Sequence, residues 1–196
     1  DMHGIFAKRR AQRLGNAEVR RRGVLVPLDL TGKHRDLLAV LFAEQTIRHA
    51  TGLHHKHHSL DPKSGKRVSF GLIRMANIEP LVDVALELYR QLWPAGVRVH
   101  LCTYHSQFPL LIRSAIERKL DQALNRRQPN AVFSLPDVLE RLRDHPEEDQ
   151  LFIVLGSPVT EVGRDHDYDW ALVEPSSMRS LIQLAGRVRR HREGEC

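Results

Sequence analysis

The sequence has few cysteines and no long apolar segment. Its two cysteines, Cys102 and Cys196, cannot build a disulfide framework, so the composition fits a reducing compartment and predicts a cytoplasmic protein. A membrane-spanning helix needs about 18 consecutive apolar residues, and no such run is present. No signal-peptide pattern opens the chain, so we expect no membrane partner. The 196 residues suffice for one domain with a sizeable core.

The sequence also lacks the loop with which many nucleotide-hydrolysing enzymes bind phosphate. A Walker A loop reads GxxxxGK[ST], and neither the glycine at position 32 nor the glycine at position 65 opens or closes such a pattern. No Asp-Glu-x-His or Asp-Glu-Ala-Asp box follows an apolar run. The His166-Asp167 pair lacks partner histidines on helices, so it does not predict a nuclease centre. A nucleotide site on this chain would therefore be half of a site.

Positive charge is in excess and is unevenly distributed. The formal net charge is +6, and the sequence pI is about 9.7. Residues 8–22 hold seven lysines and arginines against one acid, and residues 179–192 hold five arginines and no acid. This balance favours polyanionic partners, although two solvated charged faces would have the same composition. Residues 1–22 are expected to form a basic linker or helix before a domain at 23–196.

Residues 51–66, TGLHHKHHSLDPKSGK, are interpreted as a histidine-rich loop inserted into that domain. The four histidines at positions 54, 55, 57 and 58 raise the question of a metal site. Metal ligands must converge from fixed directions, and a flat run of histidines in a loop rich in Pro, Gly and Ser does not supply that geometry. A solvated or polyanion-facing loop is favoured, and no metal site is predicted.

From residue 67 onward, short apolar runs alternate with amphipathic segments. Strands are predicted at 68–75, 97–102, 151–155 and 170–173, and helices at 81–92, 108–123, 135–142 and 178–190. The apolar run at 23–28 could add a strand, which Pro27 would confine to an edge or an end. This alternation predicts an α/β fold with a parallel sheet and helices on both faces.

Polar side chains follow three of the predicted strands. Asn77 comes after the first, His105 and Ser106 after the second, and residues 157–165 after the third. In a parallel α/β sheet, ligands bind at the carboxyl ends of the strands. We therefore expect these side chains to lie along one edge of the sheet.

Gln183, Arg187 and Arg190 are spaced so that one continuous helix would carry all three on one face. An apolar face that includes Met178 and Ile182 is predicted to pack into the core. Two arginines one turn apart can stabilise the charge that develops on a transferring phosphate. A solvent-exposed basic helix would have the same pattern, so this spacing alone leaves both interpretations open.

Gly163 and Asp165 lie in a polar loop, where the glycine could allow a tight turn that presents the carboxylate to a ribose hydroxyl. An ordinary turn would have the same sequence. The segment VTEVGRDHDYDW and the following EPSSMRSLIQLAGRVRRHR resemble motifs V and VI of superfamily 2 helicases. More narrowly, they resemble the CRISPR-associated helicase-nuclease of type I-F systems. RVSFGLIRMANIEP resembles motif IV of that family, and TYHSQF resembles its motif after the next strand. The resemblance covers residues 23–192 and is most specific in 151–192.

The resemblance implies the second RecA-like lobe of an ATP-dependent translocase on single-stranded DNA, and a fragment of a longer protein. ATP with Mg²⁺ would bind between this lobe and a first lobe outside these residues. Arg190 matches the arginine finger of the family, and Arg187 matches its companion phosphate contact. Gln183 opens motif VI, while Gly163 and Asp165 match the motif V pair that links nucleotide to DNA.

Asn77, His105, Ser106 and Ser157 match positions at which the family touches the single-strand backbone. Superfamily 2 motif V commonly begins Ala-Thr, whereas here Pro158 follows Ser157 and has no amide to donate to DNA. The resemblance also implies a nuclease metal in another domain, and contacts of the parent chain with the crRNA-guided surveillance complex and the CRISPR adaptation protein. The alternatives are a superfamily 2 translocase without nuclease and a non-enzymatic module that binds DNA or protein.

Overall fold

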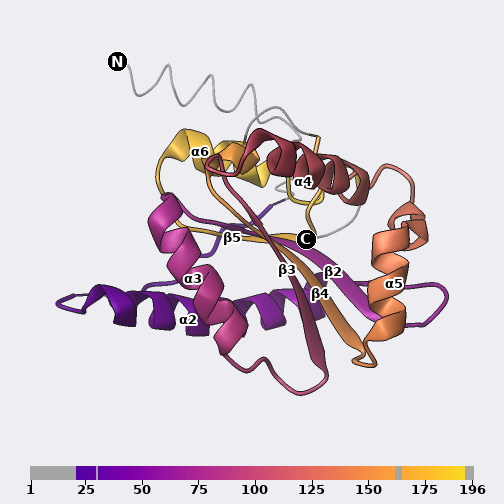
Figure 1. Cartoon of the computed structure of the whole chain (residues 1–196), viewed down its shortest axis with the longest axis horizontal. Coiled ribbons are helices and arrows are strands. Elements are labelled where there is room, and N and C mark those ends of the chain that lie inside the picture. The colour runs from indigo at the N-terminus through magenta and orange to yellow at the C-terminus, as the bar shows by residue number, and fades with distance from the viewer. Residues whose placement is uncertain (1–20, 30, 162–164, 193–196) are drawn as a thin grey trace, which may run out of the picture.

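The computed structural model describes residues 21–29, 31–161 and 165–192, which form an α/β domain around a five-stranded sheet (Figure 1). The predicted fold class is confirmed. Most of the basic segment predicted at 1–22 lies outside the described residues. The strands are β1 (Ser59–Leu60), β2 (Arg67–Arg74), β3 (Val97–Tyr104), β4 (Asp149–Gly156) and β5 (Trp170–Val173).

The sheet has the order β1-β2-β4-β3, and β5 pairs with β2 as well. The strands β2, β3, β4 and β5 are parallel, whereas the two-residue β1 runs antiparallel to β2. The register aligns Arg74, Gly156 and Tyr104 at the ends of the three longest strands, β2, β4 and β3. The carboxyl ends of these strands therefore finish level, and the segments that follow them leave from one edge.

Helices cover both faces of the sheet (Figure 1). Helices α2 and α3 lie on one side, and α4, α5 and α6 pack on the other. Successive residues of a strand point to opposite faces, so Leu72 joins the core under α4 to α6, while Ile73 joins the core under α2 and α3. The helices are α2 (Arg35–His57), α3 (Ile78–Arg90), α4 (Leu110–Ala123), α5 (Pro136–Asp144) and α6 (Met178–Ala185), with 3₁₀ turns η1 (Ala131–Ser134) and η2 (Pro158–Glu161).

The interpretation of residues 51–66 as a loop was wrong for residues 51–57, which form the last turns of helix α2. Ala43, Ile47, Ala50 and His54 follow one another at helical spacing, and all four are buried. His54 therefore continues the apolar face of the helix. Composition pointed to a loop, but burial of this face extends the helix to His57.

The apolar run at 23–28 is not a strand. Val24 and Leu25 are both largely exposed, and no described strand pairs with this segment. The edge of β2 is already paired with β1 and β5, so a strand at 23–28 would have no free partner there.

The predicted helix at 178–190 ends early, because α6 stops at Ala185 and Gly186 is its C-cap. The chain then turns back beside Tyr168, whose amide donates to the Arg187 carbonyl at 2.8 Å and whose carbonyl accepts from the Arg189 amide at 2.8 Å. Arg189 takes a left-handed conformation with φ 48° to make this turn. Gln183, Arg187 and Arg190 therefore do not share a helix face.

The apolar face predicted for this helix was also wrong. Met178 is 71% exposed and Ile182 is 66% exposed, whereas Ser180 and Leu184 are buried against the domain. Helix α6 thus leaves an apolar surface uncovered. Among the described residues, no helix is both long and apolar enough to cross a membrane.

Candidate functional site

The segments that follow β2, β3 and β4 line a groove of about 810 Å³. Its walls come from residues 76–80, 106–107 and 157–159. The groove therefore brings together Asn77, Ser106 and Ser157, three of the four residues that the sequence assigned to contact with DNA. They meet because the three strands end at the same level of the sheet.

The start of helix α3 forms one wall of the groove. Asn77 is the N-cap residue, and its side chain makes no capping hydrogen bond. The first turn of a helix carries backbone N–H groups without partners in the helix, and these groups favour anions. Glu79 lies in that same first turn and brings a negative charge to the wall.

Ser157 and His105 are less open to the groove than Asn77 and Ser106. Ser157 is buried, and its amide donates to the Tyr104 carbonyl at 3.1 Å. The His105 ring stacks on Phe108 with centroids 4.1 Å apart, and its Nδ1 is buried without a hydrogen-bond partner in the described part of the chain. Burial lowers the pKa of His105, which favours the neutral ring at pH 7.

Arg187 and Arg190 are both held by the segment that follows β4. The Arg187 guanidinium donates to the Glu161 carbonyl at 2.7 Å, and this residue is only 7% exposed. Burial lowers the pKa of Arg187. Arg190 is more open, and its Nε lies 3.0 Å from Asp165 Oδ1.

Asp165 forms ion pairs or hydrogen bonds with several basic side chains on the surface. His191 Nε2 lies 3.0 Å from its Oδ1, and Arg127 binds its Oδ2. Burial pushes the pKa of Asp165 upward, but hydrogen bonds from Arg127 and His191 outweigh it and hold the pKa below its usual value. Gln183 is exposed on α6, and Gly163 lies outside the described residues.

Two buried carboxylates fix the loop that carries Arg190. Asp167 accepts hydrogen bonds from the Arg190 amide at 3.0 Å and from the His191 amide at 3.2 Å. Asp167 and Asp169 both pair with the Arg192 guanidinium, and Asp169 also accepts from the amide of Phe70 on β2 at 2.7 Å. The loop is thereby tied to the sheet.

The other side of this loop is bound by Arg21. Its Nε donates to the Val188 carbonyl at 2.8 Å, and its Nη2 donates to the Arg189 carbonyl at 3.0 Å. This contact could not be predicted from the sequence, because it joins residues that are 167 and 168 positions apart.

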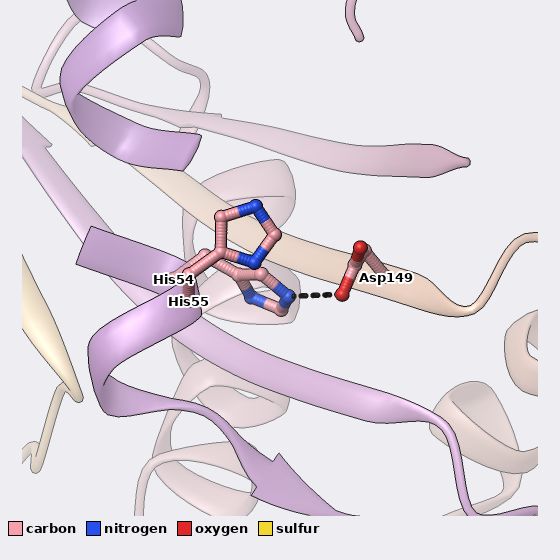
Figure 2. Close-up of side chains that lie close together, drawn as sticks. All are labelled: His54, His55 and Asp149. Atoms are coloured by element: carbon pink, nitrogen blue, oxygen red, sulfur yellow. Dashed lines mark hydrogen bonds and ion pairs between the residues drawn. The ribbon is translucent and has the colours of Figure 1, made fainter. Parts of the chain in front are cut away.

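Within the described part of the chain, His54, His55 and Asp149 are close enough to form a potential metal site (Figure 2). His54 already has partners on both ring nitrogens, because Nε2 donates to Asp149 at 3.0 Å and Nδ1 bonds Ser69 Oγ at 2.8 Å. Arg67 donates to the same carboxylate at 2.9 Å and holds the pKa of Asp149 at about 2. The Arg67 charge would oppose a cation there, so the geometry favours a buried hydrogen-bonded cluster.

Comparison with known proteins identifies the family. The model for the C-terminal part of the CRISPR-associated nuclease/helicase Cas3 matches residues 67–193, which include every residue that lines the groove as well as Arg187 and Arg190. The chain belongs to the Cas3 family. This agrees with the resemblance drawn from motifs IV, V and VI.

Two curated Cas3 proteins are similar over almost the whole chain. Both carry the description CRISPR-associated nuclease/helicase Cas3 subtype I-F/YPEST. The protein from Pseudomonas aeruginosa is 49% identical over 196 residues, which cover 99% of this chain and 18% of the relative. The protein from Pectobacterium atrosepticum is 43% identical over 192 residues, which cover 97% of this chain and 17% of the relative. The chain thus spans less than a fifth of the length of these relatives.

One buried ion pair of this Cas3 chain was not predicted from the sequence. Arg74 at the end of β2 binds Glu161 in the turn η2, with Nη2 and Oε1 2.6 Å apart, and both side chains are nearly buried. Glu161 lies inside the segment that resembles motif V, two residues before Gly163. The available signal was Arg74 itself, because a charged residue that ends a continuous apolar run needs a partner inside the fold.

Proposed function

We propose that this chain is the second motor lobe of an ATP-dependent translocase on single-stranded DNA. The observation that carries the proposal is the position of the turn η2. Its first residues, Pro158 and Val159, line the groove, and the carbonyl of its last residue, Glu161, binds Arg187. One four-residue turn therefore adjoins both candidate sites, as a motor that links nucleotide to DNA requires.

In this proposal, ATP with Mg²⁺ binds between this lobe and a first lobe of the parent protein. Arg190 is the arginine finger that stabilises the charge on the transferring phosphate, and Arg187 is its companion. Gln183, Gly163 and Asp165 complete the nucleotide-facing set. Arginine suits these positions because its planar guanidinium stays charged and grips phosphate oxygens in pairs.

The groove is the proposed path of the single-stranded DNA backbone. Asn77 and Ser106 offer polar side chains at its wall, and the start of α3 offers backbone N–H groups. His105 and Ser157 are retained as contacts in the proposal, although both lie deeper than the other two. Such contacts read the sugar-phosphate backbone and favour no base sequence.

The parent protein is proposed to act in CRISPR interference and to degrade foreign DNA. Its nuclease metal would lie in a different domain. The crRNA-guided surveillance complex would recruit it, and the CRISPR adaptation protein would be a further partner. The names of the two relatives support this proposal at the level of a CRISPR-associated nuclease/helicase.

The test is ATP turnover by the full-length parent protein carrying Arg190→Ala. We expect single-stranded-DNA-dependent turnover to fall by on the order of a thousandfold, because an arginine finger contributes at least that much to phosphoryl transfer. DNA affinity should be largely kept. Arg179→Ala, which removes an exposed charge from α6, is the matched control and should retain turnover. Loss of DNA binding with turnover intact would instead make Arg190 a DNA contact.

A further inference from the structure

Arg74 lies at the carboxyl end of β2 and binds three residues from a buried position. Its Nε donates to Glu161 Oε1 at 2.7 Å in the turn η2. Its Nη1 donates to the Glu174 carbonyl at 2.9 Å, and its Nη2 donates to Ser176 Oγ at 2.8 Å, just before helix α6. The guanidinium thus joins the sheet, the turn η2 and the approach to α6.

Glu161 accepts hydrogen bonds with both its side chain and its backbone carbonyl. Its Oε1 also accepts from Ser180 Oγ at 2.6 Å, so the carboxylate links Arg74 to helix α6. Its backbone carbonyl accepts from the Arg187 guanidinium at 2.7 Å. One residue therefore holds the helix and the arginine that follows it.

The other end of η2 is part of the groove wall. The turn is closed by the Thr160 amide, which donates to the Ser157 carbonyl at 3.0 Å, and by Thr160 Oγ1, which donates to the same carbonyl at 2.9 Å. These two bonds join the groove end of the turn to Thr160, the residue directly before Glu161. A short hydrogen-bonded path therefore connects Pro158 and Val159 with Glu161.

We infer that Glu161, held by Arg74 and Ser180, couples the occupation of the groove by single-stranded DNA to the position of Arg187. The inference rests on the proposed function. Removal of one partner from a buried ion pair leaves an uncompensated charge, so the contact between Arg74 and Glu161 resists breaking. A displacement of Glu161 is therefore expected to move its partners with it. Coupling is reciprocal, so nucleotide held by Arg187 also changes the affinity of the groove for DNA.

Glu161 and Ser180 are positioning residues in this scheme. Neither lines the groove, and the contact of Glu161 with Arg187 is made by its backbone, which a side-chain substitution retains. Loss of their side chains is therefore expected to change the response to DNA and to leave direct DNA contacts in place.

The experiment compares ATP turnover of the full-length parent protein with and without a single-stranded oligothymidylate. In Ser180→Ala, which removes one hydroxyl from a buried site, we expect DNA stimulation of kcat to fall roughly tenfold, within the usual range of coupling between sites. Basal kcat, the KM for ATP and the Kd for the oligonucleotide should stay within about twofold. Glu161→Gln should act in the same direction and more strongly.

The matched control is Ser177→Ala. Ser177 caps α6 by accepting from the Ser180 amide at 3.1 Å, so its loss weakens the same helix but leaves the Glu161 contacts intact. DNA stimulation should survive in this variant. Melting temperatures of all variants show whether each one is folded.

Two results would overturn the inference. If DNA stimulation stays within twofold of the unaltered protein in both Ser180→Ala and Glu161→Gln, the cluster only stabilises the fold. If Ser177→Ala loses stimulation as strongly as Ser180→Ala, the stability of α6 is responsible. Absence of DNA-stimulated turnover in the unaltered parent protein would be a separate result, because it overturns the proposed function without any variant.

Discussion

Arg187 and Arg190 differ in how readily each can leave its present partner. The exposed pair of Arg190 and Asp165 contributes at most about 1 kcal/mol, because water screens both charges. The buried bond from Arg187 to the Glu161 carbonyl costs about 1.5–3 kcal/mol to lose, since its donor is charged. In the proposed function, Arg190 is therefore the arginine that a phosphate would draw away at little cost, whereas Arg187 is held by Glu161.

One buried histidine, His100, is expected to make the free energy of unfolding depend on pH. His100 Nε2 donates to Gln150 Oε1 at 2.8 Å, and Arg141 lies 3.4 Å from its Nδ1. Burial lowers the pKa of His100 to about 4, with the neighbouring Arg141 charge acting in the same direction. The unfolded chain binds a proton at this ring more readily than the folded one does. The resulting stability is complete above pH 6.5 and is lost as the pH falls from 6.5 to 4.

Urea unfolding of the chain at pH 7 and pH 5 checks this dependence. We expect the free energy of unfolding to fall with pH, by at most about 3 kcal/mol from His100 alone across the full window. His100→Gln should flatten the dependence, although the buried His54, whose pKa is also lowered by burial, will retain part of it. His49→Gln, on helix α2, is the control. If the pH dependence of unfolding were unchanged in His100→Gln, His100 would not be its source.

At the scale of elements, β2 and β5 pack closely because a glycine stands where the two strands meet. Gly71 on β2 faces Trp170 on β5, and a β-carbon at Gly71 would overlap the ring of Trp170. Gly71→Ala should therefore force the indole to move and should lower the free energy of unfolding by about 1–3 kcal/mol. Urea denaturation of the chain measures the effect.

Gly52→Ala is the matched control for that substitution. Gly52 lies inside helix α2, and no atom stands within 4 Å of the position of an added β-carbon. The change should stabilise the helix by about 0.5–1 kcal/mol. Equal effects of the two substitutions would mean that the contact with Trp170 does not limit the packing of the strands.

The parallel strands could be predicted from the sequence because β2 and β4 are buried almost throughout and read as continuous apolar runs. The meeting of Asn77, Ser106 and Ser157 followed from the same pattern. The end of α6 could not be predicted, because the turn at Arg187 depends on pairing with the distant Tyr168. The burial of His54 could not be predicted from composition either, because it depends on hydrogen-bond partners in two strands.

For the whole molecule, the proposed function makes the segments that resemble motifs V and VI one side of a nucleotide site. The chain 1–196 alone should therefore show no ATP turnover, with or without single-stranded DNA, because it lacks a phosphate-binding loop of the Walker A type. A coupled ATPase assay on the purified chain tests this expectation. Clear DNA-stimulated turnover by the chain alone would contradict the proposed division of the site between two lobes.

The contact of Arg21 with the carbonyls of Val188 and Arg189 bears on where this domain can be truncated. A boundary at residue 23, chosen from the first apolar run, would remove both hydrogen bonds and leave the backbone next to Arg190 held from one side only. Arg21, which lies outside that boundary, therefore supports the backbone of the loop that carries Arg190.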